Sequence, residues 1–384
     1  MTKKSDAPAI RFKGFSDAWE QRKLGELALF NPKDELPQTF EYVDLESVVG
    51  TEMLSHRTEA KLSAPSRAQR LAHTGDLFYQ TVRPYQKNNY LFEKPDNNYV
   101  FSTGYAQMRP YVDGYFLLSL VQSDRFVKVV LDNCTGTSYP AINANDLAKI
   151  EVTAPSDENE AQKIGTIFRN IDNLITLHQR KFEKLTNVKK SMLEKMFPQN
   201  GSSYPEIRFK GFTDPWEQRK AKEICSIGTG KSNTQDQVDD GKYPFYIRSD
   251  VPVRSNKYLY DCEAVITIGD GNIGKVFHYV NGKFDLHQRC YKMTDFKDIW
   301  GKYFFYYFST KFYDRAMKMT AKATVDSVRL EMISEMDIKK PPQISEQKQI
   351  AEFFANLDNL ITLHQRELEM LQNIKKSMLE KMFV

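Results

Sequence analysis

The stretch IGTIFRNIDNLITLHQRKFEKLTNVKKSMLEKMF, residues 164–197, places apolar side chains at every third or fourth position, with charged and amide residues between them. Steps of three and four keep residues on one face of a helix, so the pattern predicts a long helix with one narrow apolar seam, as in a coiled coil. About 36 residues would form a rod of roughly 50 Å. A seam of that length outlasts the face of a single globular domain and therefore needs a partner helix.

The partner is predicted to be a second copy of the same helix. LITLHQR occurs at 174–180 and again at 360–366, and KKSMLEKMF occurs at 189–197 and again at 375–383. We expect the two copies to pair antiparallel along seams made of Ile164, Phe168, Ile171, Ile175, His178, Phe182 and Leu185, and of Ile350, Phe354, Leu357, Ile361, His364 and Leu371. The two seam histidines are interpreted as hydrogen-bonded core residues, because no cysteine or carboxylate stands at metal-ligand spacing beside either, and no metal site is predicted.

The duplication extends to a motif near the start of each half. Residues 10–23 read IRFKGFSDAWEQRK and residues 207–220 read IRFKGFTDPWEQRK. Asp157 and Glu160 are interpreted as a capping box at the start of the first long helix, and Pro198 as its stop. The chain is predicted to contain a first recognition domain (1–155), a first spacer helix (156–198), a second recognition domain (199–342) and a second spacer helix (343–384).

The two intervening modules, about 28–150 and 225–340, share almost no sequence but follow one order of elements. Each has short β-type runs, then an aromatic helix candidate (115–126 and 302–312), a polar loop and a strand-like exit into proline. Residues 280–283, with Asn281-Gly282 at the centre, predict a hairpin turn. The fold class is therefore predicted to be α+β, with two β-rich domains of the same fold separated by two long antiparallel helices in a coiled coil, related by a pseudo-two-fold internal repeat.

Composition bounds the class of protein. The 384 residues carry a net charge of +4, which permits a nucleic-acid partner without demanding one. The four cysteines form no C-x-x-C pair, so reduced thiols are expected rather than a zinc site or a disulfide scaffold. The first residues lack the apolar core of a signal peptide, and no apolar run is long enough to cross a bilayer. We expect a cytoplasmic protein with no membrane partner.

Catalytic signatures are absent or incomplete. GDGNIG at 269–274 fits G-x-G-x-x-G but leads into a β-type run where a dinucleotide site needs a helix, so it is interpreted as a tight turn between strands. GTGKS at 228–232 has Cys225 where a phosphate-binding loop needs glycine. No catalytic residue is predicted in this chain.

Loops that combine basic, amide and aromatic residues occur in both modules. Arginine reads guanine edges, asparagine and glutamine read adenine, and lysine neutralises phosphate. One such loop is more often plain solvated surface, but its occurrence in both halves favours DNA. The candidate DNA-binding residues are Arg67, Arg70, Gln80, Arg83, Tyr85, Gln86, Lys87, Asn88, Ser138 and Tyr139 in the first module, and Arg248, Ser249, Arg254, Lys257, Asn272, Lys275, His287, Arg289, Lys322 and Thr324 in the second.

The whole chain resembles the specificity (S) subunit of type I restriction-modification enzymes, HsdS. The resemblance rests on the duplicated motif and helix segments, on SRAQRLAHTGDLFYQTVRPYQKNNY at 66–90 and on YPFYIRSDV at 243–251. It implies a non-catalytic DNA-reading subunit whose two target-recognition domains each read one half of a bipartite, asymmetric sequence. It also implies double-stranded DNA, two methylation subunits (HsdM) and restriction subunits (HsdR) as partners. S-adenosylmethionine, ATP and magnesium are then expected on those partners, and no cofactor on this chain.

Two interpretations from other classes stay open at this point. One is a stand-alone DNA-binding regulatory protein, which would need a strongly basic face that a net charge of +4 does not promise. The other is a coiled-coil scaffold whose modules bind protein.

Overall fold

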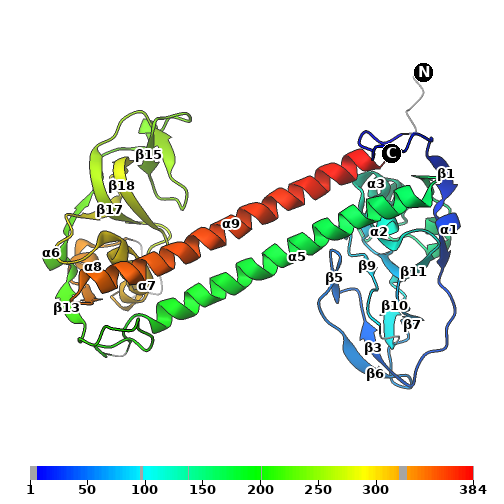
Figure 1. Ribbon diagram of the computed structural model, residues 1–384, viewed down its shortest axis with the longest axis horizontal. Coiled ribbons are helices and arrows are strands. Elements are labelled where there is room, and N and C mark those ends of the chain that lie inside the picture. Colours follow the sequence, from blue (N-terminus) through cyan, green and yellow to red (C-terminus); the bar gives the residue numbers. More distant parts are fainter. Residues whose placement is uncertain (1–6, 96–97, 137, 200, 320–326, 384) are drawn as a thin grey trace. The chain divides into compact units, whose positions relative to one another are not determined.

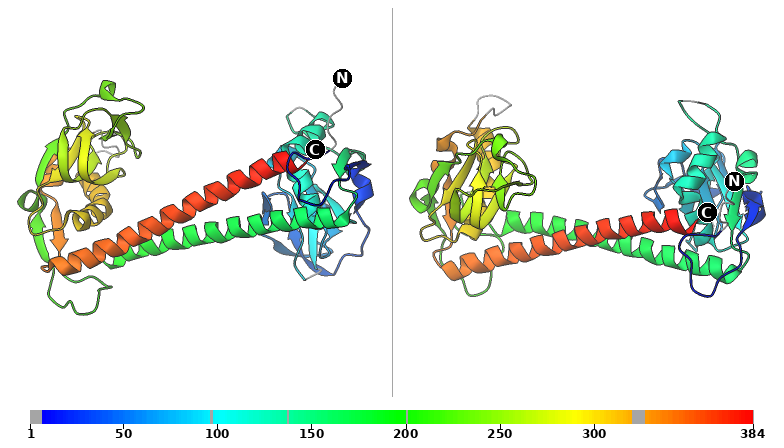
Figure 2. Two further views of the ribbon diagram at one scale, coloured as in Figure 1. Left: turned by 45° about the horizontal axis from the view of Figure 1, so that its top comes forward. Right: turned by 90° about the horizontal axis from the view of Figure 1, so that it is seen from above.

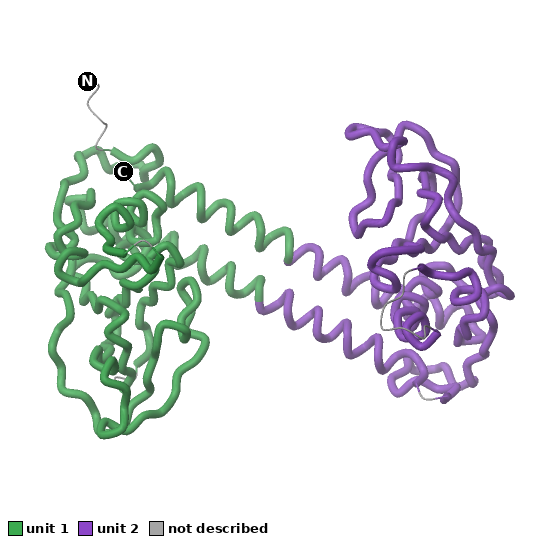
Figure 3. The backbone as a smooth tube through the Cα atoms, turned by 180° about the vertical axis from the view of Figure 1, so that it is seen from behind, with its two compact units in different colours: residues 1–179, 365–384 green, residues 180–364 purple. Residues whose placement is uncertain are grey.

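The computed structural model of the chain describes residues 7–95, 98–136, 138–199, 201–319 and 327–383. It is a mixed α+β structure (Figure 1) that divides into two compact units (Figure 3). Unit 1 joins residues 1–179 to residues 365–384, and unit 2 is residues 180–364. Among the described helices none is long and apolar enough to cross a membrane.

Two long helices, α5 (Glu158–Lys195) and α9 (Ile344–Met382), each contribute one segment to both units. Inside unit 1 they run antiparallel and side by side, as Figures 1 and 2 agree. The Phe168 and Phe383 rings are 5.9 Å apart there, and an ion pair of 2.6 Å joins Asp172 to Lys375. The antiparallel pairing predicted from the repeated seam is therefore confirmed.

The same ion pair recurs inside unit 2 between α5 and α9. Lys189 of α5 binds Asp358 of α9, and these residues are the repeat counterparts of Lys375 and Asp172. The Phe197 ring stacks on Phe354 with centroids 5.8 Å apart. Each unit thus contains one end of the helix pair, held by equivalent contacts from the duplicated sequence.

Burial along the predicted seams falls from the helix ends toward their middles. Ile164, Phe168 and Ile171 are buried in unit 1, and Ile350, Phe354 and Leu357 are buried in unit 2. The remaining seam residues, Ile175, His178, Phe182, Leu185, Ile361, His364 and Leu371, are half-buried. At its buried end a helix packs against a module core as well as the other helix, whereas toward the middle of α5 the module contributes peripheral contacts such as the hydrogen bond of 2.9 Å from Thr176 to Glu52.

A buried carboxylate near the start of each long helix is bound by the duplicated motif. In unit 1, Arg11 Nε and Nη2 donate to the two oxygens of Glu160 at 2.6 and 2.8 Å, and Trp19 Nε1 donates at 3.2 Å. In unit 2, Arg208 and Trp216 bind Glu346 in the same way, at 2.7, 2.8 and 3.3 Å. The two-pronged arginine contact and the indole N–H satisfy a charge that would be costly to bury alone.

The capping-box interpretation of Asp157 and Glu160 is wrong in its second half. Asp157 Oδ1 accepts the backbone N–H of Asn159 at 2.8 Å and so caps the helix. The Glu160 carboxylate does not turn back to the cap but binds Arg11 and Trp19. A capping box depends only on residues close in sequence. Here the Glu160 carboxylate instead accepts hydrogen bonds from the guanidinium of Arg11, which is far away in the sequence.

Unit 1 contains two four-stranded sheets, ordered β2-β11-β8-β9 and β6-β3-β10-β7, and two strand pairs, β1-β12 and β4-β5. Its strands are β1 (Glu20–Lys23), β2 (Ala28–Phe30), β3 (Thr39–Val43), β4 (Val48–Val49), β5 (Glu52–Met53), β6 (Arg57–Ala60), β7 (Ala68–Leu71), β8 (Leu77–Gln80), β9 (Tyr90–Leu91), β10 (Tyr99–Ser102), β11 (Tyr105–Pro110) and β12 (Glu151–Ala154). Its shorter helices are α1 (Leu24–Leu27), η1 (Pro84–Gln86), α2 (Gly114–Gln122), α3 (Asp124–Asp132) and α4 (Ala144–Ala148).

Unit 2 contains one six-stranded sheet, ordered β14-β19-β17-β18-β15-β16, and the pair β13-β20. Its strands are β13 (Glu217–Lys220), β14 (Ser226–Thr229), β15 (Tyr243–Tyr246), β16 (Val253–Ser255), β17 (Tyr260–Ile268), β18 (Phe277–Leu286), β19 (Cys290–Thr294) and β20 (Asp337–Lys340). Its shorter helices are α6 (Ala221–Ile224), η2 (Thr234–Asp236), α7 (Gly301–Lys318) and α8 (Leu330–Ser334).

The strand registers show that the two modules share a core. In both, the motif EQRK forms the strand that pairs with the strand leading into the long helix, β1 with β12 and β13 with β20. The order β2-β11-β8 in unit 1 corresponds to β14-β19-β17 in unit 2. Met108 of β11 pairs on both sides, and Met293 of β19 does the same at the corresponding position. The prediction of one fold for two unlike sequences is confirmed.

Two local predictions are wrong. The aromatic helix expected at 115–126 is two helices, α2 and α3, because Ser123 ends the first and caps the second by accepting the Phe126 N–H at 3.2 Å. Asn281-Gly282 is not a hairpin turn but lies inside β18, opposite Glu263 and Cys262 of β17. The turn between these strands is the GDGNIG segment, as its interpretation as a glycine turn predicted.

The helix ends complete the cores of the modules. Met382 and Phe383 at the end of α9 are buried with Trp19 and Phe116 in unit 1. Met196 and Phe197 at the end of α5 are buried with Trp216, Tyr303 and Phe354 in unit 2. Each core therefore needs residues from the other copy of the repeat.

Replacing Glu346 by Ala is expected to lower the free energy of unfolding of unit 2 by about 3–5 kcal/mol. The Arg208 side chain, 13% exposed, would lose its counter-charge, and the Trp216 N–H would lose its acceptor. Thermal unfolding followed by near-ultraviolet circular dichroism measures the effect. Glu352→Ala, on the exposed face of the same helix, is the matched control, and an equal loss in both variants would contradict the role given to Glu346.

Candidate nucleic-acid interface

A cavity of about 380 Å³ lies at the same topological place in each module. Two residues beyond the end of β8, Val82 forms a β-bridge to Ala141; two residues beyond the end of β17, Asp270 forms the corresponding bridge to Ser327. The cavity of unit 1, called the first socket below, is lined by the polar residues Glu46, Gln80, Arg83, Gln86, Asn88 and Tyr139 and by the apolar residues Leu45, Val48, Val49 and Val82. The second socket is lined by Thr234, Ile247, Arg248, Asp270, Asn272 and His287. The shared scaffold thus carries different side chains at one place.

The first socket presents amides, one stacked cation and the exposed carboxylate of Glu46. Gln80 is 2% exposed, and its Nε2 donates to Val82 O at 2.6 Å and to Gln86 Oε1 at 2.8 Å. Its Oε1 is buried and has no hydrogen-bond partner among the described residues. The Arg83 guanidinium lies 4.5 Å from the centre of the exposed Tyr139 ring. The amide pair offers both a donor and an acceptor, which is the pattern that reads adenine.

The backbone that holds this socket is strained. Arg83 and Lys87, at the two ends of η1, adopt positive φ angles of 54° and 55°. Pro84 begins the short helix, and Arg83 N donates to Pro140 O at 2.8 Å. Non-glycine residues in this region cost free energy and concentrate at functional sites, so the loop is fixed in a conformation that local preference would not give.

The second socket is organised by one carboxylate between two arginines. Arg248 Nη1 donates to both oxygens of Asp270 at 3.2 Å, and Arg289 Nη1 donates to Asp270 Oδ2 at 2.8 Å. Burial raises the pKa of the Asp270 carboxyl, but the hydrogen bonds from Arg289 and Arg248 outweigh burial and leave the pKa below its ordinary value. Asp270 is therefore a charged brace at neutral pH.

His287 adds a neutral donor to the second socket. It is 5% exposed, and burial, helped by the nearby Arg248 charge, lowers the pKa of its imidazole. Its Nδ1 faces the backbone N–H of Arg289 at 3.1 Å and so acts as the acceptor. The neutral ring then carries its proton on Nε2.

The structure brings together only part of the predicted set. Gln80, Arg83, Gln86, Asn88 and Tyr139 meet in the first socket, and Arg248, Asn272 and His287 in the second, where Arg289 joins through Asp270. The other described candidates, Arg67, Arg70, Tyr85, Lys87, Ser138, Ser249, Arg254, Lys257 and Lys275, do not line either socket. Lys322 and Thr324 lie outside the described residues.

Several of these outlying cations have protein partners. Lys87 Nζ donates to Gln122 O at 2.8 Å and binds Asp124. Arg254 donates to the backbone oxygens of Gly241 and Lys242 at 2.8 and 2.9 Å. Lys257 pairs with Asp236 at 2.8 Å. These contacts stabilise the modules. The three cations therefore already bind protein groups.

Asp270 lines the second socket and is a residue that the sequence interpretation did not single out. It sits inside GDGNIG, where glycine turn signals dominate, and an acidic residue does not fit the basic pattern sought for DNA. The available signal was its place directly after the apolar run AVITIG, between two arginine-bearing loops.

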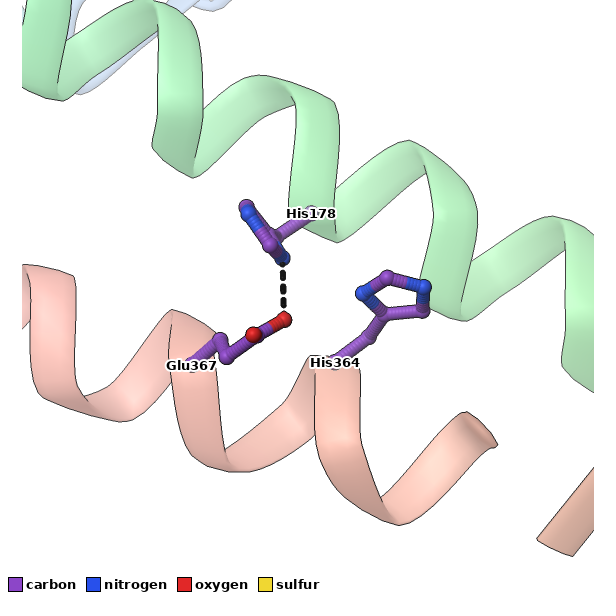
Figure 4. Close-up of side chains that lie close together, drawn as sticks. All are labelled: His178, His364 and Glu367. Atoms are coloured by element: carbon purple, nitrogen blue, oxygen red, sulfur yellow. Dashed lines mark ion pairs between the residues drawn. The ribbon is translucent and has the colours of Figure 1, made fainter. Parts of the chain in front are cut away.

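The seam histidine of unit 1 has a protein partner. His178 Nδ1 lies 2.9 Å from a carboxylate oxygen of Glu367, and Figure 4 also draws His364, one turn before Glu367 on α9. The premise that no carboxylate stands at ligand spacing beside a seam histidine is wrong, because Glu367 stands three residues after His364. The absence of a metal itself stays a prediction. The four cysteines are free thiols, and burial raises the pKa of Cys225 and Cys290 to about 12, so neither is reactive at neutral pH.

The comparison with known families decides the class. The sequence matches the family described as "Type I restriction modification DNA specificity domain" over residues 57–187 and 213–373. Each range covers most of one module and most of the long helix that follows it. The chain belongs to this family. It is a type I specificity subunit with two DNA-recognition regions, and subunits of this kind are non-catalytic.

Characterised relatives agree with this assignment. The chain is 25% identical over 299 residues to the MjaVIII specificity subunit of Methanocaldococcus jannaschii, which covers 70% of this chain and 68% of that one. The EcoDI specificity subunit of Escherichia coli is 29% identical over 76 residues, 20% of this chain and 17% of the relative. The S subunit from M. genitalium has the same fold, with a TM-score of 0.72 at 15% identity over 98% of this chain and 99% of that one.

For this specificity subunit we expect Arg83→Ala and Lys87→Ala to act differently. Arg83 faces the first socket, so its loss should cost about 1–3 kcal/mol on the cognate DNA and relax specificity at one position. Lys87 binds Asp124 and Gln122, so its loss should lower stability and leave base preference intact. Binding to cognate and single-mismatch duplexes at two salt concentrations, beside thermal unfolding, separates the two effects. A change of base preference in Lys87→Ala alone would reverse this assignment.

Proposed function

We propose that this chain reads a bipartite, asymmetric DNA target, one half with each unit, and assembles the catalytic subunits of a type I restriction-modification enzyme. The observation that carries the proposal is the pair of sockets at one topological place on a shared core. An unchanged frame with different polar side chains at equivalent positions is what two independent readers of different sequences require.

The chemistry of the sockets supports different half-sites. The first offers amide groups and one guanidinium stacked on a tyrosine. The second offers two guanidinium groups and a neutral histidine. Amide side chains pair with adenine and guanidinium groups with guanine, so the two sockets favour different bases.

Exposed leucines from the repeated heptapeptide support the scaffolding role. Leu174 and Leu177 are 43% and 45% exposed in unit 1, and Leu360 and Leu363 are 43% and 49% exposed in unit 2. Apolar side chains exposed at neighbouring helix positions mark interaction surfaces. Because each unit presents two leucines at equivalent positions of the repeat, the units suit two copies of one partner, which we take to be the methylation subunit (HsdM).

Catalysis then belongs to the partners. S-adenosylmethionine would be bound by the methylation subunits, and ATP and magnesium by the restriction subunits (HsdR). This chain contributes the choice of sequence and the surfaces on which the complex forms.

Exchange of one module tests the reading function. Residues 28–150 are replaced by the corresponding module of another specificity subunit, and the methylated sequence is determined in cells that carry the matching methylation subunit. We expect one half of the target to change and the other to stay. A hybrid that alters both halves would show a single composite site instead of two readers.

Replacement of exposed leucines tests the scaffold. Leu177→Ser together with Leu363→Ser should leave thermal stability nearly unchanged and weaken binding of the methylation subunit at both positions. Leu62→Ser is the control, since Leu62 is 99% exposed but lies in a module loop. Pull-down and analytical ultracentrifugation with purified methylation subunit measure assembly, and full assembly by the double variant would overturn this surface.

A further inference from the structure

Arg248 and Arg289 each donate hydrogen bonds to Asp270 from only one nitrogen of the guanidinium. Both contacts are made by Nη1, at 3.2 and 2.8 Å. No other acceptor within the described part of the chain takes a hydrogen bond from either guanidinium. The two side chains are 46% and 62% exposed, whereas the Asp270 side chain is 17% exposed. Each arginine is thus fixed at one nitrogen and keeps further N–H donors for a ligand.

The segments that carry Asp270 and Arg289 are fixed by backbone contacts. Gly269 N donates to Arg289 O at 2.8 Å, and Val328 N donates to Gly269 O at 2.7 Å. A Cβ on Gly269 would lie 2.5 Å from Arg289 O, so only glycine allows this approach. The Asp270 carboxylate is therefore held in a rigid frame, which lowers the entropy lost when the arginines bind a ligand.

The donor pattern selects among DNA groups. Guanine presents two acceptors, O6 and N7, side by side in the major groove, whereas adenine presents an acceptor beside a donor. A guanidinium has only donors, so it matches guanine and leaves the adenine donor unsatisfied. Phosphate binding is less favoured, because Asp270 offsets part of the positive charge that phosphate contacts depend on.

We propose that the second socket reads a guanine of its half-site through the arginine pair. Arg248, which lines the socket, is the contacting residue. Asp270 is a positioning residue that acts by holding the two arginines. This deepens the proposed function and rests on unit 2 reading one half of the DNA target. The ligand is the major-groove edge of a guanine in duplex DNA.

Base analogues test the acceptors directly. Once module exchange has assigned one half of the methylated sequence to unit 2, 7-deazaguanine is placed at each guanine of that half. It removes N7 from the major groove. We expect the assembled methyltransferase to bind about 5- to 150-fold more weakly at one such position. Inosine at the same position keeps O6 and N7 and should bind like guanine.

Variants then assign the effect to residues. Arg248→Ala removes every donor of the guanidinium, so this variant should bind guanine and 7-deazaguanine duplexes equally. Asp270→Asn should reduce the same discrimination, which a purely structural role would not do. Arg254→Ala is the matched control, because that guanidinium already serves Gly241 and Lys242, and it should keep full discrimination whatever its stability.

The outcomes separate this inference from the proposed function. If no bipartite methylated sequence exists, the proposed function itself fails. If the sequence is bipartite but the half read by unit 2 has no guanine, or 7-deazaguanine binds as well as guanine, the guanine assignment alone is overturned. Full discrimination in Arg248→Ala, with unchanged thermal unfolding, would likewise remove Arg248 as the contact.

Discussion

A carboxylate with almost no solvent exposure stands in the first turn of each long helix, and an arginine and a tryptophan from far upstream bind it. Such a charge is tolerated in a protein interior only when every partner is in place. The position of Glu160 therefore fixes where the RFKGF segment runs, and Glu346 does the same in unit 2. The variable module lies between the duplicated motif and the long helix, and this contact joins the two. The ends of the module are therefore held in the same way whatever its own sequence.

The two modules share their central strands and differ in the segments that follow β8 and β17. Strands that lie between two neighbours, such as β11 and β19, keep the same register in both units although their side chains differ. The residues just beyond β8 and β17 leave the ladder of the sheet and are held by single bridges instead, Val82 to Ala141 and Asp270 to Ser327. At this place unit 1 has a strained loop around Pro84, and unit 2 has a glycine turn that carries Asp270. The side chains of the two sockets thus lie where regular strand pairing has ended.

The sequence predicted the features that depend on periodicity and repetition. The seam of α5 followed from apolar spacing, because apolar period and burial are directly related. The partner helix followed from the exact repeat, and the common fold of the modules followed from the matching order of their elements. Features that depend on distant partners did not follow. Asn281-Gly282 carries a strong turn signal, yet pairing along β17 keeps it extended. Glu160 fits a local cap pattern, yet Arg11 binds it. Asp270 gains its role only when the Arg248 and Arg289 loops converge, and no single segment contains that information.

The order in which the chain is made differs from the order in which its units become whole. Unit 2 takes all its residues from one uninterrupted stretch, 180–364, whereas unit 1 needs residues 365–384 as well. Trp19 and Phe383, with rings 6.2 Å apart, are separated by almost the entire sequence, and closing so long a loop is slow and entropically costly. The module that leaves the ribosome first is thus the last to close its core. A chain halted shortly after residue 364 would carry a complete second unit beside a first unit whose Trp19 and Phe116 still lack the rings they pack against.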